Sequence, residues 1–417
     1  MAAMFFGWRM VALAFLTNFI SVGFVFYSYG VFFKALASDF GGSRLGVSLG
    51  LTCMNVVSSL LSPKVGGWLD AGRIKRTMIV GAGLMGVGFV LASAITELWH
   101  FYLVIALVMG PGVCMLGVLP STTLVANWFV DRRGAALGLA TMGVSLSGVL
   151  MPPLATGLIA QIGWRGTFLV YAATAGILVI PAVARWIVQR PEDVGQRPDG
   201  RTSLAPAEQA LPNTAWSHLL RERNFWLTAT VVGFNFCAMG ALLTHAVPHA
   251  TDIGFSPAAA ALLLSVMAGA GALGKPIFGG ITDRLDKRAV IWLVSGMQLV
   301  GLLLLLDAAD YLSLLVAGAA FGFGMGGVVP LHGALIGAAF GRQAFGRVMG
   351  LMTPFMLPLT SLGVPYAGYI FDRDHSYGFA FQSFAGLYLV AMVAAFFLRL
   401  PSNRLGDLPD AALSTHP

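Results

Sequence analysis

Apolar runs of about 20 residues recur along the whole of this 417-residue chain and leave little length for anything else. Each run is long enough for a helix that crosses a hydrocarbon core of roughly 30 Å. Only 10% of the residues are charged, whereas a soluble domain carries about 25%. The sequence therefore predicts an all-α membrane protein, with the lipid bilayer as its main surrounding.

Twelve transmembrane helices are expected, and one polar stretch divides them into two groups of six. The expected spans are residues 8 to 31, 46 to 68, 76 to 96, 100 to 127, 134 to 160, 166 to 189, 225 to 250, 257 to 281, 289 to 306, 311 to 339, 346 to 371 and 378 to 399. We predict an N-terminal six-helix bundle (1–189), a proline-containing linker (190–223), a C-terminal six-helix bundle (224–400) and a tail (401–417). The first span lacks the pattern of a signal peptide, so we expect it to be retained.

The basic residues predict how the chain is oriented. With both termini in the cytoplasm, nineteen of the 25 Lys and Arg residues fall on the cytoplasmic side, as the positive-inside rule requires. The net charge of +7 is then a consequence of topology, and no nucleic-acid partner is indicated. The three cysteines, Cys53, Cys114 and Cys237, all fall within apolar spans. We interpret them as buried structural thiols, and no metal site is predicted.

Two loop motifs occur twice along the chain. "GGWLDAGRIKR" at 66 to 76 is echoed by "GGITDRLDKR" at 279 to 288, which makes Asp70 and Asp283 equivalent. "WFVDRRG" at 128 to 134 is echoed by "FGRQAFG" at 340 to 346, which makes Gly134 and Gly346 equivalent. The sequence offsets of the two pairs differ by a single position. Two similar halves joined by a basic linker are typical of transporters whose halves rock about a central site.

The glycine-rich loop with an aspartate followed by basic residues, and its echo, resemble the signature of the major facilitator superfamily. Glycines allow two helices to approach closely, and an aspartate can meet a helix N-terminus across the loop. We therefore expect a gate that opens and closes as the halves move; a solvated, positive-inside hairpin is the alternative. The expected gate residues are Asp70, Arg73, Arg132, Arg133, Asp283 and Arg284.

Longer motifs narrow the resemblance. "GWRMVALAFLTNFISVGFVFYSYGVFFKAL", "NWFVDRRGAALGLATMGVSLSG", "THAVPHATDIG" and "FGRQAFGRVMGL" are similar to segments of monocarboxylate transporters and oxalate/formate exchangers. The resemblance implies two pseudo-symmetric six-helix bundles that carry small organic anions, often together with a proton. It also suggests a bacterial member that resides in the cytoplasmic membrane and functions as a monomer.

Ionisable residues inside the spans are the strongest functional indicators, because each is costly to keep in a membrane. All 18 carboxylates fall in loops or at span ends, which argues against a cation exporter that depends on a buried acid. Two bases lie within spans. Lys64 precedes Asp70 by six residues, so we expect it to extend to the membrane surface. Lys275 precedes Asp283 by eight and is expected to lie deeper.

The functional hypothesis for Lys275 is that its ammonium binds the carboxylate of the substrate in the cavity between the halves. The resemblance implies an arginine at this position with the same role, so lysine is a departure that removes bidentate binding. Animal members carry an aspartate one turn earlier, where this chain has Gly271. That second departure weakens the case for proton coupling through an aspartate.

Five further residues are candidates for the substrate path. His245 and His332 are the two histidines that we consider for this path, because an imidazole titrates near neutral pH, although either could be a neutral histidine bonded between helices. The resemblance places Tyr27, Tyr29 and Ser145 near the substrate.

The sequence thus favours a secondary transporter of small monocarboxylates such as lactate or pyruvate, working by alternating access with proton symport. Anion exchange, and export of dicarboxylates or aromatic acids, are the alternatives within transport. A membrane enzyme or sensor fits poorly, because we identify no catalytic nucleophile, metal cluster or soluble domain. No cofactor is predicted, and no phosphate-binding loop indicates an ATP-driven step.

Overall fold

The structure is a computed structural model that describes residues 5–40, 44–200, 216–308 and 310–400. The predicted tail (401–417) and the middle of the predicted linker (201–215) lie outside these residues. The described residues are helical almost throughout. The N-terminal half contains α1 (Gly7–Val22), α2 (Tyr29–Phe40), α3 (Arg44–Trp68), α4 (Ile74–Ser93), α5 (Leu98–Val104), α6 (Gly110–Leu116), α7 (Val118–Trp128), α8 (Arg133–Thr174) and α9 (Ile180–Trp186). The C-terminal half contains α10 (Trp216–Leu219), α11 (Arg223–Asp252), α12 (Pro257–Arg284), α13 (Lys287–Leu306), α14 (Tyr311–Gly326), α15 (Val328–Phe340), α16 (Phe345–Asp374) and α17 (Gly378–Phe396).

Ten helical stretches of the described chain are long and apolar enough to cross a membrane. Two of them, Leu49–Ser93 and Arg133–Trp186, contain 45 and 54 residues, more than twice the roughly 20 that one crossing needs. Each contains a glycine with a left-handed backbone, Gly72 (φ 76°) and Gly163 (φ 72°). Both glycines fall in loops that the sequence predicts, so each of these two stretches can be divided there into two helices.

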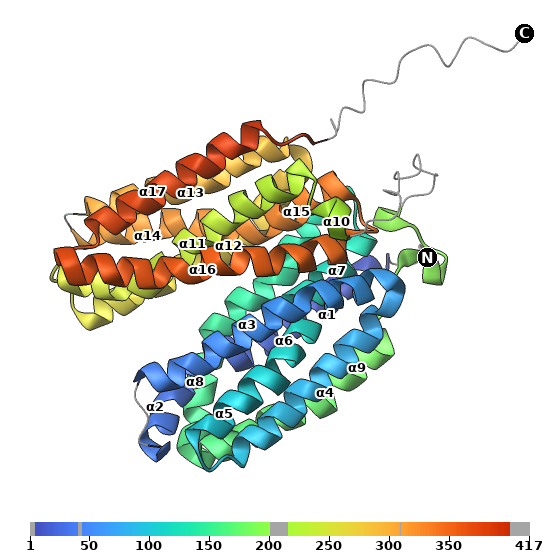
Figure 1. The fold of residues 1–417 in the computed structure, drawn as a ribbon, viewed down its shortest axis with the longest axis horizontal. Coiled ribbons are helices and arrows are strands. Elements are labelled where there is room, and N and C mark those ends of the chain that lie inside the picture. Colours follow the sequence, from blue (N-terminus) through green and yellow to red (C-terminus); the bar gives the residue numbers. More distant parts are fainter. Residues whose placement is uncertain (1–4, 41–43, 201–215, 309, 401–417) are drawn as a thin grey trace, which may run out of the picture.

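The helices form two bundles that lie one above the other in Figure 1, with blue-to-green segments in one and green-to-red segments in the other. The N-terminal bundle has its own apolar core, which includes Met10, Phe89 and Trp128. The C-terminal bundle has two core clusters, around Phe345 in one and Tyr388 in the other. The cluster around Phe345 also includes Ala126 of α7, so apolar packing joins the two halves there. Cys53 corrects one prediction, because it is exposed whereas Cys114 and Cys237 are buried.

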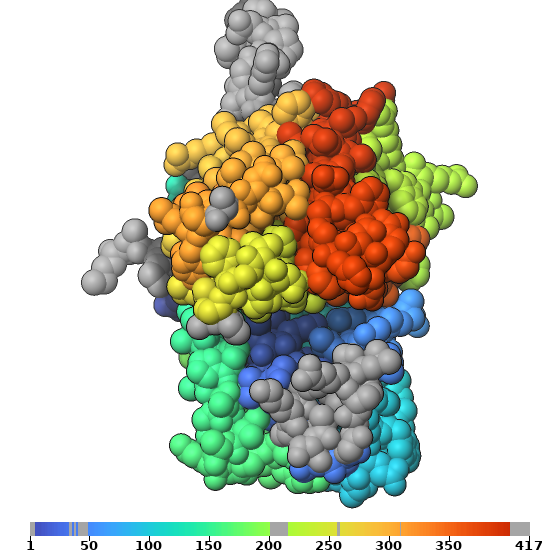
Figure 2. Space-filling model, turned by 90° about the vertical axis from the view of Figure 1, so that its left-hand side faces the viewer, coloured from blue at the N-terminus to red at the C-terminus, as the bar shows by residue number. Residues whose placement is uncertain are grey.

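The bundles meet at one end of the molecule and diverge at the other. The short helix α10 and the C-terminal end of α17 lie at the end where the bundles meet, which we call the terminal end (Figure 1). Figure 2 looks onto the opposite end, which we call the distal end, and shows a recess between the two halves. The structure is therefore closed at the terminal end and open at the distal end.

Candidate binding site between the bundles

Two pairs of helices close the terminal end, and the internal repeat relates one pair to the other. Gly134 of α8 faces Gly279 of α12 so closely that a Cβ on either would lie 2.3 Å from the carbonyl oxygen of the other. Gly66 of α3 faces Gly346 of α16 in the same way, and a Cβ on Gly66 would lie 2.1 Å from the Gly346 oxygen. Only glycine permits backbones to approach this closely.

One aspartate lies beside each of these contacts and binds the N-terminus of a helix in the other bundle. The Asp283 carboxylate accepts hydrogen bonds from the backbone N–H groups of Gly134 (2.6 Å) and Ala135 (2.8 Å) at the start of α8. The Asp70 carboxylate accepts from Gly346 (2.9 Å) and Arg347 (2.8 Å) at the start of α16. A helix N-terminus attracts negative charge. We call these two contacts the aspartate latches.

The predicted basic gate residues do not share one environment. Arg73, Arg132 and Arg284 are exposed at the terminal end. Arg133 is buried: its Nε donates to the carbonyl oxygen of Phe129 at 3.1 Å, and a Cβ on Gly337 of α15 would overlap its guanidinium. Arg133 therefore packs across the interface between the bundles, whereas the other three arginines lie in solvent.

Lys275 lies eight residues before Asp283 on α12, about two helical turns deeper than the latches. Its side chain crosses the interface between the same two bundles. Its Nζ donates to the hydroxyl of Ser145 at 2.6 Å and to the carbonyl oxygen of Thr141 at 3.0 Å, both on α8 of the other bundle. The side chain is only 8% exposed. Both acceptors are neutral, so no carboxylate offsets the charge through these bonds. Lys64, by contrast, is exposed on α3.

The internal repeat shows which residue of the N-terminal half is equivalent to Lys275. Lys275 and Ser62 are related by the same sequence offset as the two latch aspartates, and their facing glycines, Gly138 and Gly350, by that offset to within one position. A Cβ on Gly138 would lie 2.4 Å from the Lys275 oxygen, and one on Gly350 would lie 2.3 Å from the Ser62 oxygen. Ser62 closes its contact with a hydrogen bond to the Gly350 carbonyl at 2.7 Å. The lysine is therefore not needed to bring the helices together, since a serine serves in the equivalent contact.

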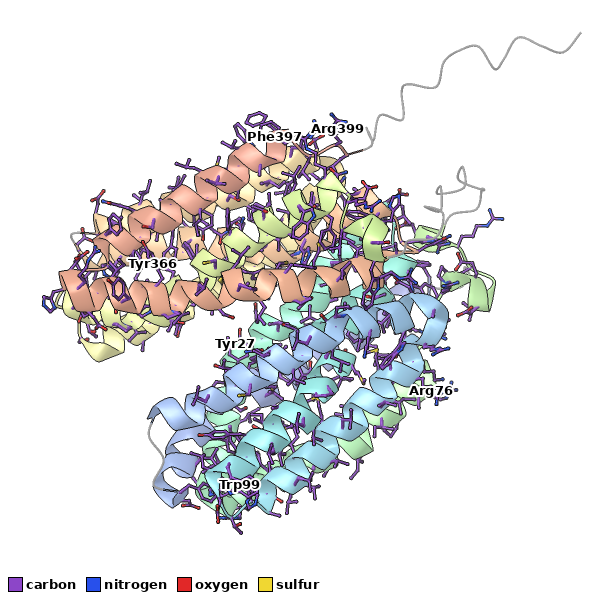
Figure 3. The ribbon with its side chains drawn as sticks, viewed as in Figure 1. Tyr27, Arg76, Trp99, Tyr366, Phe397 and Arg399 are labelled. Carbon is purple, nitrogen blue, oxygen red and sulfur yellow. The ribbon has the colours of Figure 1, made fainter. Side chains whose placement is uncertain are left out.

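Tyr27 faces the space between the bundles, and Tyr29 does not. Tyr27 ends a π-helical turn, Gly23–Tyr27, and is 41% exposed. Its ring packs on Gly148 of α8, one turn beyond Ser145, and Figure 3 shows it between the two bundles. Tyr29 packs inside the N-terminal bundle, with its ring 6.2 Å from that of Phe101.

The two candidate histidines lie within the C-terminal bundle. His245 of α11 has both ring nitrogens engaged: Nε2 lies 3.0 Å from the Val364 carbonyl oxygen, and Nδ1 lies 3.1 Å from the Tyr377 hydroxyl. A carbonyl oxygen can only accept, so Nε2 carries a proton and the ring joins helices of its own bundle. His332 of α15 is 6% exposed, and its Nε2 has no hydrogen-bond partner among the described residues.

Sequence reasoning missed part of this site. It named Lys275 and Ser145 but did not bring them together, and it did not identify Thr141 as an acceptor. The offset between the two halves, applied to Lys275, would have identified Ser62 as its counterpart. Among the described residues, no group of three or more His, Cys, Asp or Glu side chains could hold a metal ion.

Comparison with known proteins shows which family the chain belongs to. The sequence model described as Major Facilitator Superfamily matches residues 12–249 and 246–414. The chain belongs to the major facilitator superfamily. A solved structure of the human organic anion transporter MFSD10 superposes with a TM-score of 0.69, covering 93% of this chain and 99% of that one at 15% identity. At that identity the likeness shows the shared fold alone.

Similarity to curated proteins extends over nearly the whole chain. Monocarboxylate transporter 13 of Bos taurus is 29% identical, with 98% of this chain and 94% of that protein covered. Monocarboxylate transporter 2 of Homo sapiens is 26% identical, with 93% and 84% covered. The chain is therefore a multi-pass secondary transporter of small molecules and not an enzyme, and it resembles the group that its sequence motifs suggested.

Proposed function

We propose that this superfamily member carries small monocarboxylates, of the size of lactate or pyruvate, across the membrane by alternating access with a co-transported proton. The observation that carries the proposal is the position of Lys275, whose buried ammonium crosses the bundle interface and is bonded there to two neutral oxygens. A buried cation is stable only when a counter-charge or several hydrogen bonds offset its desolvation. A substrate carboxylate entering from the distal end would provide that charge.

Substrate binding would change what Lys275 holds. An ammonium has three N–H donors, and two of them reach Thr141 and Ser145. Ser145 offers the ammonium only the dipole of a neutral hydroxyl, whereas a carboxylate offers a full opposite charge, which offsets the desolvation of a buried cation. The substrate therefore competes well with the Ser145 hydroxyl. Tyr27 lies on the same side of α8 and offers a phenol to the rest of the ligand.

The aspartate latches supply the conformational part of the cycle. Both are closed in this structure, while the distal end is open (Figure 2). With both termini in the cytoplasm of a bacterial cell, this is the state that receives substrate from outside. Release to the cytoplasm requires the latches to part. His332, buried without a partner for Nε2 among the described residues, is the residue we propose for proton coupling; exchange against a second anion is the alternative.

A ligand panel tests the proposed substrate class. The purified protein and its Lys275→Ala variant are heated with lactate, pyruvate, succinate, benzoate, a neutral sugar or an organic cation. A ligand at about 100 times its Kd stabilises the folded state by about 2.7 kcal/mol, so Tm of the wild type should rise with lactate or pyruvate. The variant should not respond. Stabilisation by the sugar or the cation alone would overturn the proposed class, and stabilisation by succinate or benzoate alone would favour the alternative substrates.

The matched control for this panel is Lys64→Ala. Lys64 is also a span lysine, but it is exposed and lies outside the bundle interface. Its removal should leave the response to lactate and pyruvate intact. Equal loss of the response in both variants would mean that general positive charge, and not the Lys275 site, attracts the anions.

A further inference from the structure

The chain that follows α9 is fixed to the N-terminal bundle. We call residues 189–200 the bracket. The Arg190 guanidinium donates to the backbone oxygen of Asp70 at 3.1 Å, beside one aspartate latch. The Asn127 side-chain amide donates to the backbone carbonyl oxygen of Gln189 at 3.4 Å. The Asp193 carboxylate accepts from the backbone N–H of Arg190 at 3.1 Å, which holds the short helical turn Pro191–Val194 in place.

Asp199 strengthens this attachment at the opposite end of the bracket. Its carboxylate accepts from three consecutive backbone N–H groups in the loop before α8: Val130 (2.9 Å), Asp131 (2.9 Å) and Arg132 (3.3 Å). Asp199 has a left-handed backbone (φ 57°), which is uncommon for a residue with a side chain. The bracket therefore moves with the N-terminal bundle.

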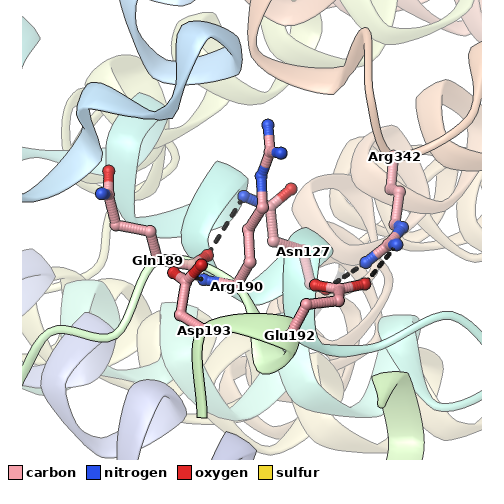
Figure 4. A network of polar contacts seen from close by, with 6 residues as sticks. All are labelled: Asn127, Gln189, Arg190, Glu192, Asp193 and Arg342. Atoms are coloured by element: carbon pink, nitrogen blue, oxygen red, sulfur yellow. Dashed lines mark hydrogen bonds and ion pairs between the residues drawn. The ribbon is translucent and has the colours of Figure 1, made fainter. Parts of the chain in front are cut away.

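One side chain of the bracket reaches the other bundle. The Glu192 carboxylate forms an ion pair with the guanidinium of Arg342, N to O 2.5 Å, in the loop before α16 (Figure 4). Arg342 also donates to the backbone oxygen of Asn127 at 3.3 Å. The partners are partly exposed, 45% for the Glu192 side chain and 22% for that of Arg342. Both line a polar cavity of about 280 Å³ that also contacts Asp70.

The repeat explains why this pair is placed to connect the halves. Arg342 and Val130 are related by the offset that relates the two copies of their loop motif, so the loops that carry them are repeat equivalents. One precedes α8 and is bound by Asp199; the other precedes α16 and is bound by Glu192. A single segment thus holds both of the loops from which the latch helices begin. Partial burial alone would raise the pKa of Glu192. The hydrogen bond from Arg342, a backbone hydrogen bond and the charges of Arg342 and Arg190 together outweigh burial and lower that pKa.

We propose that the Glu192–Arg342 ion pair is a third latch, through which the bracket holds the terminal end of the transporter closed independently of substrate. The pair joins the bundles directly, so parting them at this end must break it. Partly exposed ion pairs contribute modestly. Its loss should shift the ratio of closed to open molecules about two- to fivefold toward the state that is open at the terminal end.

The test measures the gap at the terminal end without any substrate. Spin labels are attached to cysteines introduced by Arg76→Cys and Arg399→Cys, two exposed positions on different bundles, in a full-length chain carrying Cys53→Ala, Cys114→Ala and Cys237→Ala. The distribution of label distances is recorded in lipid nanodiscs. Glu192→Gln and Arg342→Gln should each enrich long distances, Arg342→Lys should enrich them less, and the double glutamine variant should be no more open than the more open single variant.

Two controls make the result decisive. Glu222→Gln removes a carboxylate at the same end that pairs with His218 of its own half and should leave the distribution unchanged. Raising salt to about 1 M, where the Debye length is about 3 Å, should open the wild type more than Glu192→Gln. The proposal is overturned if Glu192→Gln matches the wild type at low salt, or if the two single effects simply add. No transported ligand is involved, so either outcome is independent of the proposed substrate class.

Discussion

Replacing Lys275 by alanine is expected to abolish carboxylate uptake, reducing the initial rate by about two orders of magnitude or more. Removing one partner of a buried, hydrogen-bonded charge pair costs about 2 to 5 kcal/mol, and each 1.4 kcal/mol is about a factor of ten. The variant should still fold, because Ser62 shows that the equivalent helix contact forms without a lysine. Uptake of labelled lactate and pyruvate into proteoliposomes measures the loss.

Two further variants separate charge from shape. Lys275→Arg should retain measurable uptake, because a guanidinium keeps the charge and can bind a carboxylate through two parallel bonds. Lys64→Ala should transport at close to the wild-type rate, since that lysine is exposed and outside the interface. Wild-type uptake by Lys275→Ala would rule out the proposed site, and a complete loss in Lys275→Arg would show that more than a positive charge is required there.

Neutralising both aspartate latches, Asp70→Asn with Asp283→Asn, is expected to open the terminal end. Each carboxylate accepts two backbone N–H bonds from a helix start in the other bundle, and bonds to a charged group contribute about 1.5 to 3 kcal/mol. Asparagine keeps one acceptor but loses the charge, so we expect about tenfold per latch and about 100-fold for both together. The Arg76 and Arg399 spin labels should report a population dominated by long distances.

Asp286→Asn is the matched control for the latches. Asp283 lies in the last turn of α12, and Asp286 follows it just before α13. The Asp286 carboxylate accepts from the backbone N–H of Arg288, at the start of its own helix α13. Its neutralisation should therefore leave the label distances unchanged. If Asp286→Asn opened the terminal end as much as the latch variants, the effect would arise from loop charge in general. If the latch variants stayed closed, the aspartates would not be what holds the bundles together.

Features that depend on local pattern were predicted from the sequence. Span length is set by membrane thickness, and the recurrence of Asp70 at Asp283 pointed to a paired gate. The sequence analysis expected each aspartate to meet a helix N-terminus across its own loop, whereas the structure places each one at a helix N-terminus of the other bundle.

The sequence did not predict which side chains on different helices contact each other. Lys275 was recognised as a buried charge, but its acceptors lie 134 and 130 residues away in the other bundle, and no local pattern encodes that pairing. His245 was a candidate for the substrate path, yet both of its nitrogens are engaged within one bundle. The sequence analysis predicted only a proline-containing linker at 190–223, whereas the start of this linker forms the bracket. Asp199 meets the three backbone N–H groups that it binds only in the folded loop.

The most direct test of the account is an experimental structure of the protein with pyruvate bound. We predict that the pyruvate carboxylate lies within hydrogen-bond distance of the Lys275 Nζ, between α8 and α12, and that Nζ has released the Ser145 hydroxyl it holds at 2.6 Å here. A structure in which the carboxylate is bound elsewhere, while Lys275 still donates to both Ser145 and Thr141, would contradict the account.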